Sequence, residues 1–235
     1  MPFNRLGWLR CRLPIRLIEA QSERRVISEY DDPIGDEQLA PALAPLIRGG
    51  ELVELRRHHP SNLDAFQRWY GDEEIARMLR HDQRPLNEIQ SRGYFQSIIL
   101  PASARDMAFA IHERSTGRLI GATALTDFGG QVIHSAFFRI VIGEKDCWGR
   151  GYGTEATRLV VQEGFERHRL DVIKLEVFKH NARARNTYTR IGFRTMGEHV
   201  EYVGRDRYQL DVIEMEIDHP SFVAANDVWL SRQQR

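Results

Sequence analysis

Residues 147–156 read Cys-Trp-Gly-Arg-Gly-Tyr-Gly-Thr-Glu-Ala, and this stretch joins an apolar strand to an amphipathic helix. Gly149, Gly151 and Gly153 permit positive φ angles and let a ligand approach the backbone closely. The N-terminus of the following helix presents unpaired N–H groups and the positive end of the helix dipole. Together these features predict a site for a phosphate or pyrophosphate group at the start of that helix.

Two standard phosphate-binding motifs do not fit this stretch. The sequence contains no P-loop of the form GxxxxGKS or GxxxxGKT. The spacing also departs from GxGxxG, because Ala156 stands where the third glycine belongs, although dinucleotide-binding folds sometimes tolerate alanine there. A Rossmann unit should begin near the head of its domain, whereas this strand follows a hairpin. We therefore disfavour a nicotinamide cofactor.

The hydrophobic pattern on either side predicts a mixed sheet covered by helices. Apolar runs predict strands at residues 52–55, 107–112, 119–125, 136–143, 173–178, 194–202 and 208–217. Helical spacing predicts helices around 63–69 and 73–80, over 84–99 with Pro101 as its end, and over 154–168 and 182–191. The fold class is therefore α/β (α+β), with a sheet of about six or seven strands.

Composition limits the kinds of partner. The chain has 235 residues, and Lys plus Arg equal Asp plus Glu at 33 each, so no overall basic charge attracts nucleic acid. Cys11 and Cys147 are too few for a disulfide framework, which indicates a reducing compartment. No apolar run approaches the ~18–20 residues that span a bilayer. We expect a soluble, cytoplasmic protein that binds neither nucleic acid nor membrane.

The chain divides into three predicted parts: an N-terminal extension at 1–50, a main domain at 51–220 and a C-terminal tail at 221–235. The first 18 residues carry four arginines and no acidic residue, among many apolar side chains. A membrane-touching or targeting segment is one interpretation. We favour an extension packed on the main domain or on a partner subunit. That extension and the exposed edge of the sheet favour a homodimer.

A second motif lies downstream of the glycine stretch. Asn181 follows the strand 173–178, and residues 188–193 read Tyr-Thr-Arg-Ile-Gly-Phe. In their order and spacing, the two motifs resemble the GNAT superfamily of acyl-CoA-dependent N-acyltransferases, and most closely its ribosomal-protein N-terminal acetyltransferase (RimJ/RimL-like) branch. Asp211 and Met215 also resemble the closing strand of that branch. The resemblance implies a GNAT-like mixed, mostly antiparallel sheet with splayed central strands and helices on both faces.

The resemblance implies acetyl-CoA as a co-substrate. The turn at 148–154 would hold its pyrophosphate with backbone amides, which agrees with the predicted anion site, and the strand at 140–142 would pair with its pantetheine arm. Asn181 would hydrogen-bond CoA, and an Asx helix cap is a compatible alternative. Arg150 and Arg183 would meet phosphates or would simply be solvated. The predicted cofactor residues are Ile140, Val141, Ile142, Trp148, Gly149, Arg150, Gly151, Tyr152, Gly153, Thr154, Asn181 and Arg183.

Catalytic roles follow from the same resemblance. Tyr188 matches the tyrosine that protonates the departing CoA thiolate, a transfer that is nearly balanced because a phenol has a pKa of ~10 and a thiol one of ~8.5. A merely packed aromatic ring is the alternative. The amine would attack the thioester directly in a ternary complex, which requires a base to accept its proton. Glu176 is our candidate for that base. Asp211, His134 and Glu51 are rivals.

Backbone N–H groups near residues 141–143 would stabilise the oxyanion of the tetrahedral intermediate. We disfavour Cys147 as a nucleophile, because no histidine lies close to it in the sequence. We expect no metal, because the pair His58–His59 has no second ligand pair at metal spacing.

The predicted function is transfer of an acetyl group to a primary amine, on a protein N-terminus or a small molecule. The alternative is a non-catalytic acyl-CoA-binding sensor or assembly module, which would not need the proton donor Tyr188. The helices between residues 63 and 99 should form much of the acceptor site. Their neighbourhood is locally basic, which would suit an acidic acceptor; the arginines concerned are Arg56, Arg57, Arg77, Arg80 and Arg84.

Overall fold

The computed structural model describes residues 44–204 and 208–234 of the chain. These residues lie in one compact unit, which begins at Ala44. The predictions for residues 1–43, including those for Cys11 and the basic, apolar N-terminus, fall outside the described residues. In the part that is described, no helix has both the length and the apolar character needed to cross a membrane.

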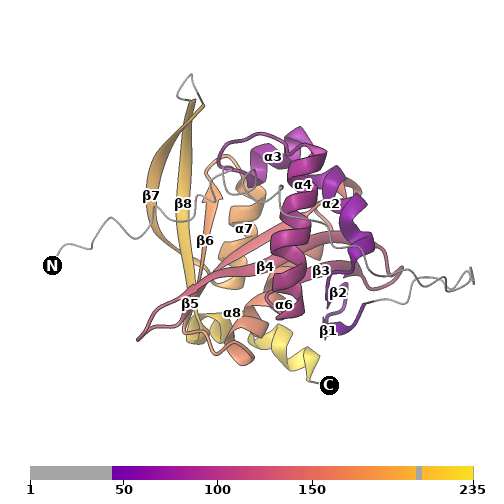
Figure 1. Ribbon diagram of the computed structural model, residues 1–235. Helices are drawn as coiled ribbons and strands as arrows, with labels where there is room; N and C mark the ends of the chain where they lie inside the picture. The colour runs from indigo at the N-terminus through magenta and orange to yellow at the C-terminus, as the bar shows by residue number, and fades with distance from the viewer. Residues whose placement is uncertain (1–43, 205–207, 235) are drawn as a thin grey trace, which may run out of the picture. The chain divides into compact units, whose positions relative to one another are not determined.

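Eight strands form one sheet in the order β1-β2-β3-β4-β5-β6-β8-β7 (Figure 1). Every neighbouring pair in it is antiparallel except β5 and β6, which run parallel. The predicted mixed, mostly antiparallel sheet is confirmed, with eight strands rather than six or seven. The strands are β1 (Leu46–Gly49), β2 (Val53–Arg56), β3 (Ala108–Glu113), β4 (Leu119–Gly129), β5 (Ser135–Ile142), β6 (Val172–Phe178), β7 (Arg194–Val203) and β8 (Tyr208–Asp218).

The two ends of the compact unit differ from the expected extension and tail. Strand β1 lies before residue 50 and pairs with β2, where Arg56 also donates a hydrogen bond from Nη1 to the Ala44 carbonyl oxygen at 2.8 Å. The segment after residue 220 lies in α8 (His219–Gln233), which buries Phe222 in the main core. Four residues give β1 too little periodicity to be read from the sequence. The three-part division as such stays a prediction.

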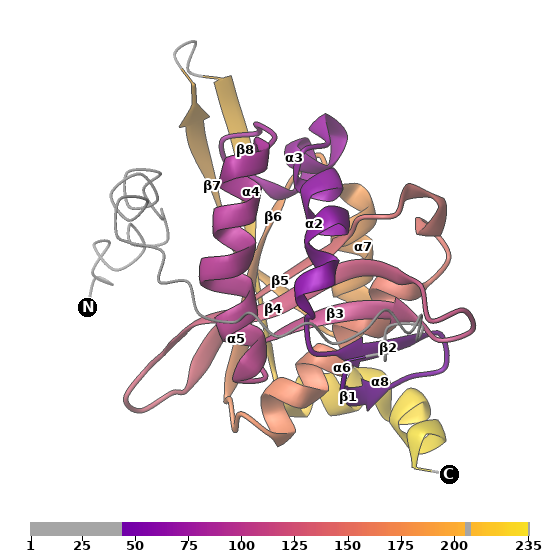
Figure 2. The same ribbon diagram turned by 45° about the vertical axis from the view of Figure 1, so that its right-hand side comes forward.

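Helices cover both faces of the sheet (Figures 1 and 2). One group consists of α2 (Leu63–Tyr70), α3 (Glu73–Leu79), α4 (Glu88–Tyr94), the π-helical turn η3 (Phe95–Ile99) and α5 (Leu100–Ala104). On the other face lie α6 (Tyr152–Glu166), α7 (Ala182–Ile191) and α8. The expected helix end at Pro101 is wrong: helical residues run without a break from Glu88 to Ala104, and Pro101 follows the π-helical turn η3, an irregularity in the backbone ladder of the kind found at prolines.

The two faces of the sheet differ in side-chain size. Large residues such as Phe109, Ile111 and Leu125 are fully buried in the core shared with α6, α7 and α8. Alanines face the other helix group, where Ala108 and Ala124 pack with Phe66 and Phe95. Small side chains let α2 and η3 approach the sheet closely, because protein interiors tolerate few voids.

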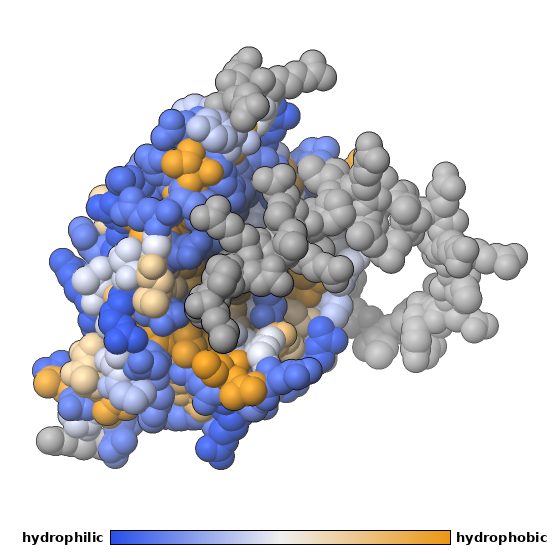
Figure 3. All heavy atoms as spheres, turned by 90° about the vertical axis from the view of Figure 1, so that its left-hand side faces the viewer, coloured by the Kyte–Doolittle hydropathy of each residue, from blue (hydrophilic) through white to orange (hydrophobic). Residues whose placement is uncertain are grey.

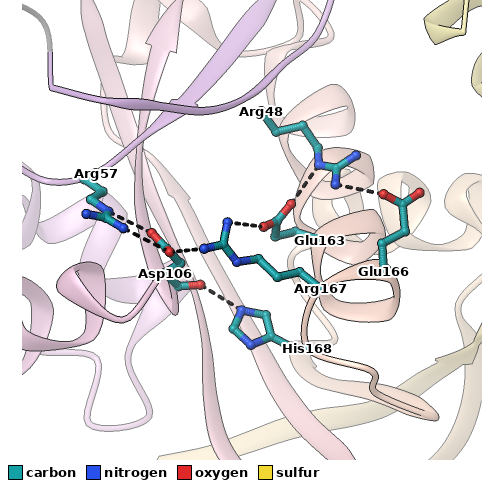
Figure 4. A network of polar contacts seen from close by, with 7 residues as sticks. All are labelled: Arg48, Arg57, Asp106, Glu163, Glu166, Arg167 and His168. Carbon is teal, nitrogen blue, oxygen red and sulfur yellow. Dashed lines mark hydrogen bonds and ion pairs between the residues drawn. The ribbon is translucent and has the colours of Figure 1, made fainter.

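A network of hydrogen bonds and ion pairs links the C-terminal end of α6 to the sheet (Figure 4). Asp106 is 4% exposed and accepts hydrogen bonds from Arg57 Nε at 2.8 Å and from Arg167 Nη2. Arg167 also pairs with Glu163, which in turn pairs with Arg48 on β1 at 2.8 Å. The hydrogen bond from Arg57 holds the pKa of Asp106 below its ordinary value. The network lies apart from the cavity described below and is structural.

Strand β7 is an edge of the sheet, with β8 as its one neighbour among the described strands. Figure 3 turns this side of the molecule toward the viewer, and hydrophilic residues cover most of the surface that the grey atoms leave visible, with hydrophobic residues between them. Val200 and Tyr202 on β7 and Tyr208 on β8 are exposed side chains of the edge strands. Such an edge is able to pair with another chain, and the homodimer stays a prediction.

Candidate active site

The parallel strands β5 and β6 separate along their length. They pair only where Ser135, Ala136 and Phe137 face Val172, Ile173 and Lys174, although β5 continues to Ile142 and β6 to Phe178. A cavity of about 580 Å³ lies at this separation and is lined from β5, β6, α3, α6 and α7. A single cavity of this size suits a small-molecule site.

One end of the cavity is the N-terminus of α6. Gly149 and Gly151 have φ angles of +76° and +89°, a left-handed conformation that favours glycine. Gly151 is the N-cap residue, and among the described residues no side-chain hydrogen bond caps the helix. A Cβ atom on Gly153 would lie 3.4 Å from Ile142 Cγ1, an ordinary contact distance, so this turn lies directly against β5. First-turn N–H groups without a side-chain cap suit an anion.

Trp148 joins this turn to the two neighbouring elements. Its Nε1 donates a hydrogen bond to the Ile142 carbonyl oxygen at 2.7 Å. The guanidinium carbon of Arg183, at the start of α7, lies 4.1 Å from the centroid of the Trp148 ring. Both residues line the cavity. The sequence suggested each of them separately but gave no sign of their stacking.

Asn181 caps α7, since its Oδ1 accepts a hydrogen bond from the Ala184 N–H at 3.2 Å. It also lines the cavity. The helix-cap interpretation is therefore correct, and it leaves the side-chain amide group for a ligand.

Tyr188 lines the middle of the cavity from α7. Its ring packs against Phe138 and Phe193, with centroid distances of 6.1 and 5.7 Å. No hydrogen-bond partner of its hydroxyl is found among the residues that the structure describes. Burial raises the pKa of Tyr188 well above its ordinary value. The phenol therefore stays protonated at any physiological pH and is able to act as a hydrogen-bond donor.

Glu176 lines the cavity from β6, so the candidate base and Tyr188 share one space. Its Oε2 lies 3.2 Å from His81 Nε2, and His81 Nδ1 lies 2.8 Å from Glu201 Oε2. Burial would raise the pKa of Glu176, but the hydrogen bond with His81 and nearby positive charges outweigh it, so that its pKa lies below the ordinary value. Glu51, His134 and Asp211, the rivals, do not line the cavity.

Two of the predicted cofactor residues lie outside the cavity lining. Arg150 is exposed, with its guanidinium carbon 5.4 Å from the Tyr152 ring centroid. Tyr152 is buried, and its hydroxyl donates to Glu113 on β3. The other ten line the cavity: Ile140, Val141, Ile142, Trp148, Gly149, Gly151, Gly153, Thr154, Asn181 and Arg183. At the predicted oxyanion position, the Gly143 N–H is already used, because it donates to the Ile120 carbonyl oxygen at 2.9 Å.

Part of the cavity wall is apolar. Ile75, Met78 and Leu79 of α3 contribute to it, together with Phe137 and Phe178. Of the helices between 63 and 99, α3 lines the cavity, and their role in an acceptor site stays a prediction. The arginines in the lining are Arg139, Arg183 and Arg190, and none of the five that were expected to form a basic wall lies there. Carboxylates pair with most of them instead: Arg56 with Glu54, Arg57 with Asp106, Arg77 with Glu73 and Arg80 with Asp82.

Cys147 is a free, buried thiol at the cavity wall. Burial raises the pKa of this thiol above its ordinary value. A thiol that resists ionisation is a poor nucleophile, which agrees with our expectation against an acyl-enzyme.

Comparison with known proteins agrees with this geometry. The sequence profile of the acetyltransferase (GNAT) domain matches residues 53–194. No curated protein matches the chain by sequence. The spermidine N-acetyltransferase from Vibrio cholerae, solved with CoA and spermine, superposes with a TM-score of 0.63 at 19% identity, over 74% of this chain and 99% of that one. Mycobacterium smegmatis RimJ in complex with CoA-disulfide gives a TM-score of 0.63 at 18% identity, over 77% and 90%.

The ribosomal-protein-S5-alanine acetyltransferase from Vibrio fischeri gives a TM-score of 0.60 at 14% identity, over 73% of this chain and 95% of that one. These likenesses show a shared fold. They include RimJ and a ribosomal-protein acetyltransferase, which agrees with the branch that the two sequence motifs resemble.

Proposed function

The chain belongs to the acetyltransferase (GNAT) family, and we propose that it is an N-acetyltransferase that moves an acetyl group from acetyl-CoA to a primary amine. The acceptor would be a protein N-terminus or a small-molecule amine. One observation carries this proposal: a single cavity is lined by the uncapped start of α6, by Tyr188 and by Glu176. An anion site, a proton donor and a proton acceptor are therefore available in the same cavity.

The residues present fit acetyl-CoA. The open N–H groups at the start of α6 suit its pyrophosphate, and Arg183, stacked on Trp148, adds a positive charge beside them. Separation of β5 from β6 leaves room at residues 140–142 for an extended ligand arm to lie beside the strand. Acetyl-CoA would supply the acetyl group as an activated thioester.

Two side chains would move protons. Glu176 would accept a proton from the attacking amine, directly or through water, because its carboxylate is ionised and lines the cavity. Tyr188 would donate a proton to the departing thiolate, because its phenol is kept neutral by burial. The two groups are assigned opposite tasks because their environments shift their pKa values in opposite directions.

The cavity favours an amine that carries an apolar group. An incoming ammonium would meet Glu176, and its substituent would meet apolar side chains of the cavity wall, such as Phe178 on the same strand. The names of the similar structures include both a polyamine acetyltransferase and a ribosomal-protein acetyltransferase. The choice between a small amine and a protein N-terminus therefore has to come from experiment.

Calorimetric titration with acetyl-CoA, followed by thiol release against a panel of amines and N-terminal peptides, tests the proposal. We expect binding of acetyl-CoA and release of CoA thiol with one class of amine. Binding without release on any acceptor would instead support an acyl-CoA sensor or assembly module. Absence of binding would overturn the acetyl-CoA assignment.

A further inference from the structure

His81 lies between Glu176, the candidate base, and Glu201 on the edge strand β7. It lies in the loop after α3, where its ring meets Phe178 edge-on, with centroids 5.3 Å apart. One ring nitrogen contacts Glu176 at 3.2 Å and the other contacts Glu201 on β7 at 2.8 Å. The imidazole is thus held between the two carboxylates.

The charged groups around Glu176 come from four elements. His81 faces it from the loop after α3, and His199 and Glu214 bring side-chain atoms within 4.8 Å of it and of each other from β7 and β8. Arg139 on β5 adds a more distant positive charge. His199 also pairs with Glu214 at 3.0 Å, and it lies 3.6 Å from Glu201. Of these groups, His81 makes the ion-pair contact with Glu176.

We propose that His81, anchored by Glu201, is a positioning residue that orients the Glu176 carboxylate toward the cavity and keeps it ionised. This inference rests on the proposed role of Glu176 as the base. The imidazole is held at both nitrogens, so it fixes one carboxylate oxygen of Glu176 and leaves the other for the amine or a water molecule.

The direction of the charge effect follows from the groups present. Glu176 raises the pKa of His81, and His81 lowers the pKa of Glu176, as expected for an ion pair in a partly buried place. When the imidazole is removed, burial still favours the protonated carboxyl group, whereas His199 and Arg139 still favour the ionised one. Because the largest of the effects that favour ionisation is lost, Glu176 should take up its proton at a higher pH.

The test follows the ¹³C carboxyl resonance of Glu176, assigned by its loss in Glu176→Gln, through a pH titration of the full-length protein. In His81→Gln, we expect the titration midpoint to rise by about one pH unit. Glu201→Gln should raise it by a smaller amount, because it loosens the imidazole without removing it. His180→Gln, a change at an exposed histidine that bonds Arg77 instead, should leave the midpoint unchanged.

Turnover provides the second readout. With a fixed amine, we expect the acidic limb of the kcat profile of His81→Gln to lie about one pH unit above that of the wild type. At a pH below both midpoints kcat should therefore be about tenfold lower than in the wild type, and it should recover as the pH rises. Equal midpoints in wild type and His81→Gln would overturn the inference. A raised midpoint in a protein that acetylates no amine would overturn the proposed function, and would leave His81 as the residue that sets the charge of Glu176.

Discussion

The guanidinium of Arg183 stacks on the indole of Trp148, with 4.1 Å between its central carbon and the ring centroid. The two residues belong to the two motifs of the sequence, one before α6 and one at the start of α7. Both residues line the cavity, as does the start of α6. Arg183 therefore adds a positive charge to the site where a phosphate group of acetyl-CoA is proposed to lie.

Arg183→Ala should weaken the binding of acetyl-CoA about fivefold, or ~1 kcal/mol, since both the stacked cation and its charge are lost. Calorimetric titration measures this change. Arg185→Ala is the matched control, because Arg185 lies on the same helix but does not line the cavity. Equal weakening by both changes would mean that only the general charge of α7 matters.

Tyr188→Phe should lower kcat by a factor of about 10²–10³, with less than about a twofold change in the Kd for acetyl-CoA. The phenylalanine ring keeps the packing against Phe138 and Phe193, so only the proton donor is removed. Steady-state kinetics and titration on the same preparation separate the two effects. If the Kd rose as much as kcat fell, Tyr188 would be a packing residue and not the acid.

Gly50→Ala should destabilise the fold by about 2–4 kcal/mol. A Cβ atom at Gly50 would lie 2.5 Å from Glu155 Oε2. That carboxylate is buried and accepts hydrogen bonds from the backbone N–H groups of Glu51, Leu52 and Val53, so it has no freedom to move aside.

The neighbouring glycine is the control for this prediction. A Cβ atom at Gly49 would meet nothing within 4 Å, so Gly49→Ala should change the stability by less than about 0.5 kcal/mol. Urea unfolding followed by circular dichroism measures both variants. If the Gly50→Ala protein were as stable as Gly49→Ala, the Glu155 carboxylate would not fix the backbone at the start of β2.

His58 should make the fold sensitive to acid. Burial is the main cause that lowers its pKa, from 6.5 to about 4. Between pH 6.5 and about 4, His58 is therefore protonated in the unfolded chain but neutral in the folded one. The free energy of unfolding falls as the pH drops through this range. The full effect is about 3 kcal/mol.

The His58→Phe variant tests this account, because it keeps an aromatic ring beside Phe95 but cannot titrate. We expect the free energy of unfolding of the variant to depend less on pH between 6.5 and 4, whatever its absolute stability. Urea titrations at several pH values in this range give the slope. The same slope in both proteins would rule out His58 as the source.

The glycine stretch was predictable because its signal is local. Gly149 and Gly151 with positive φ angles and Asn181 at the start of α7 each follow from backbone requirements within a few residues. The order of apolar runs likewise fixed seven of the eight strands. The exception, β1, is short and obtains its stability from pairing with β2.

Long-range pairing was not predictable. His81 and Glu201 are separated by 120 positions in the chain, and only the folded sheet brings them together with Glu176. The same cause explains why the arginines expected to form a basic wall lie outside the cavity lining. Arg57 is paired with Asp106, 49 positions away, and such a partner does not appear in local charge patterns.

The central claim is direct transfer from acetyl-CoA to an amine in one complex. Initial rates of CoA thiol release, with acetyl-CoA and the best amine both varied, test it most directly. We predict double-reciprocal lines that intersect, in wild type and equally in Cys147→Ala, because both substrates must share the cavity before the acetyl group moves. Parallel lines that depend on Cys147, or no thiol release with any amine, would contradict it.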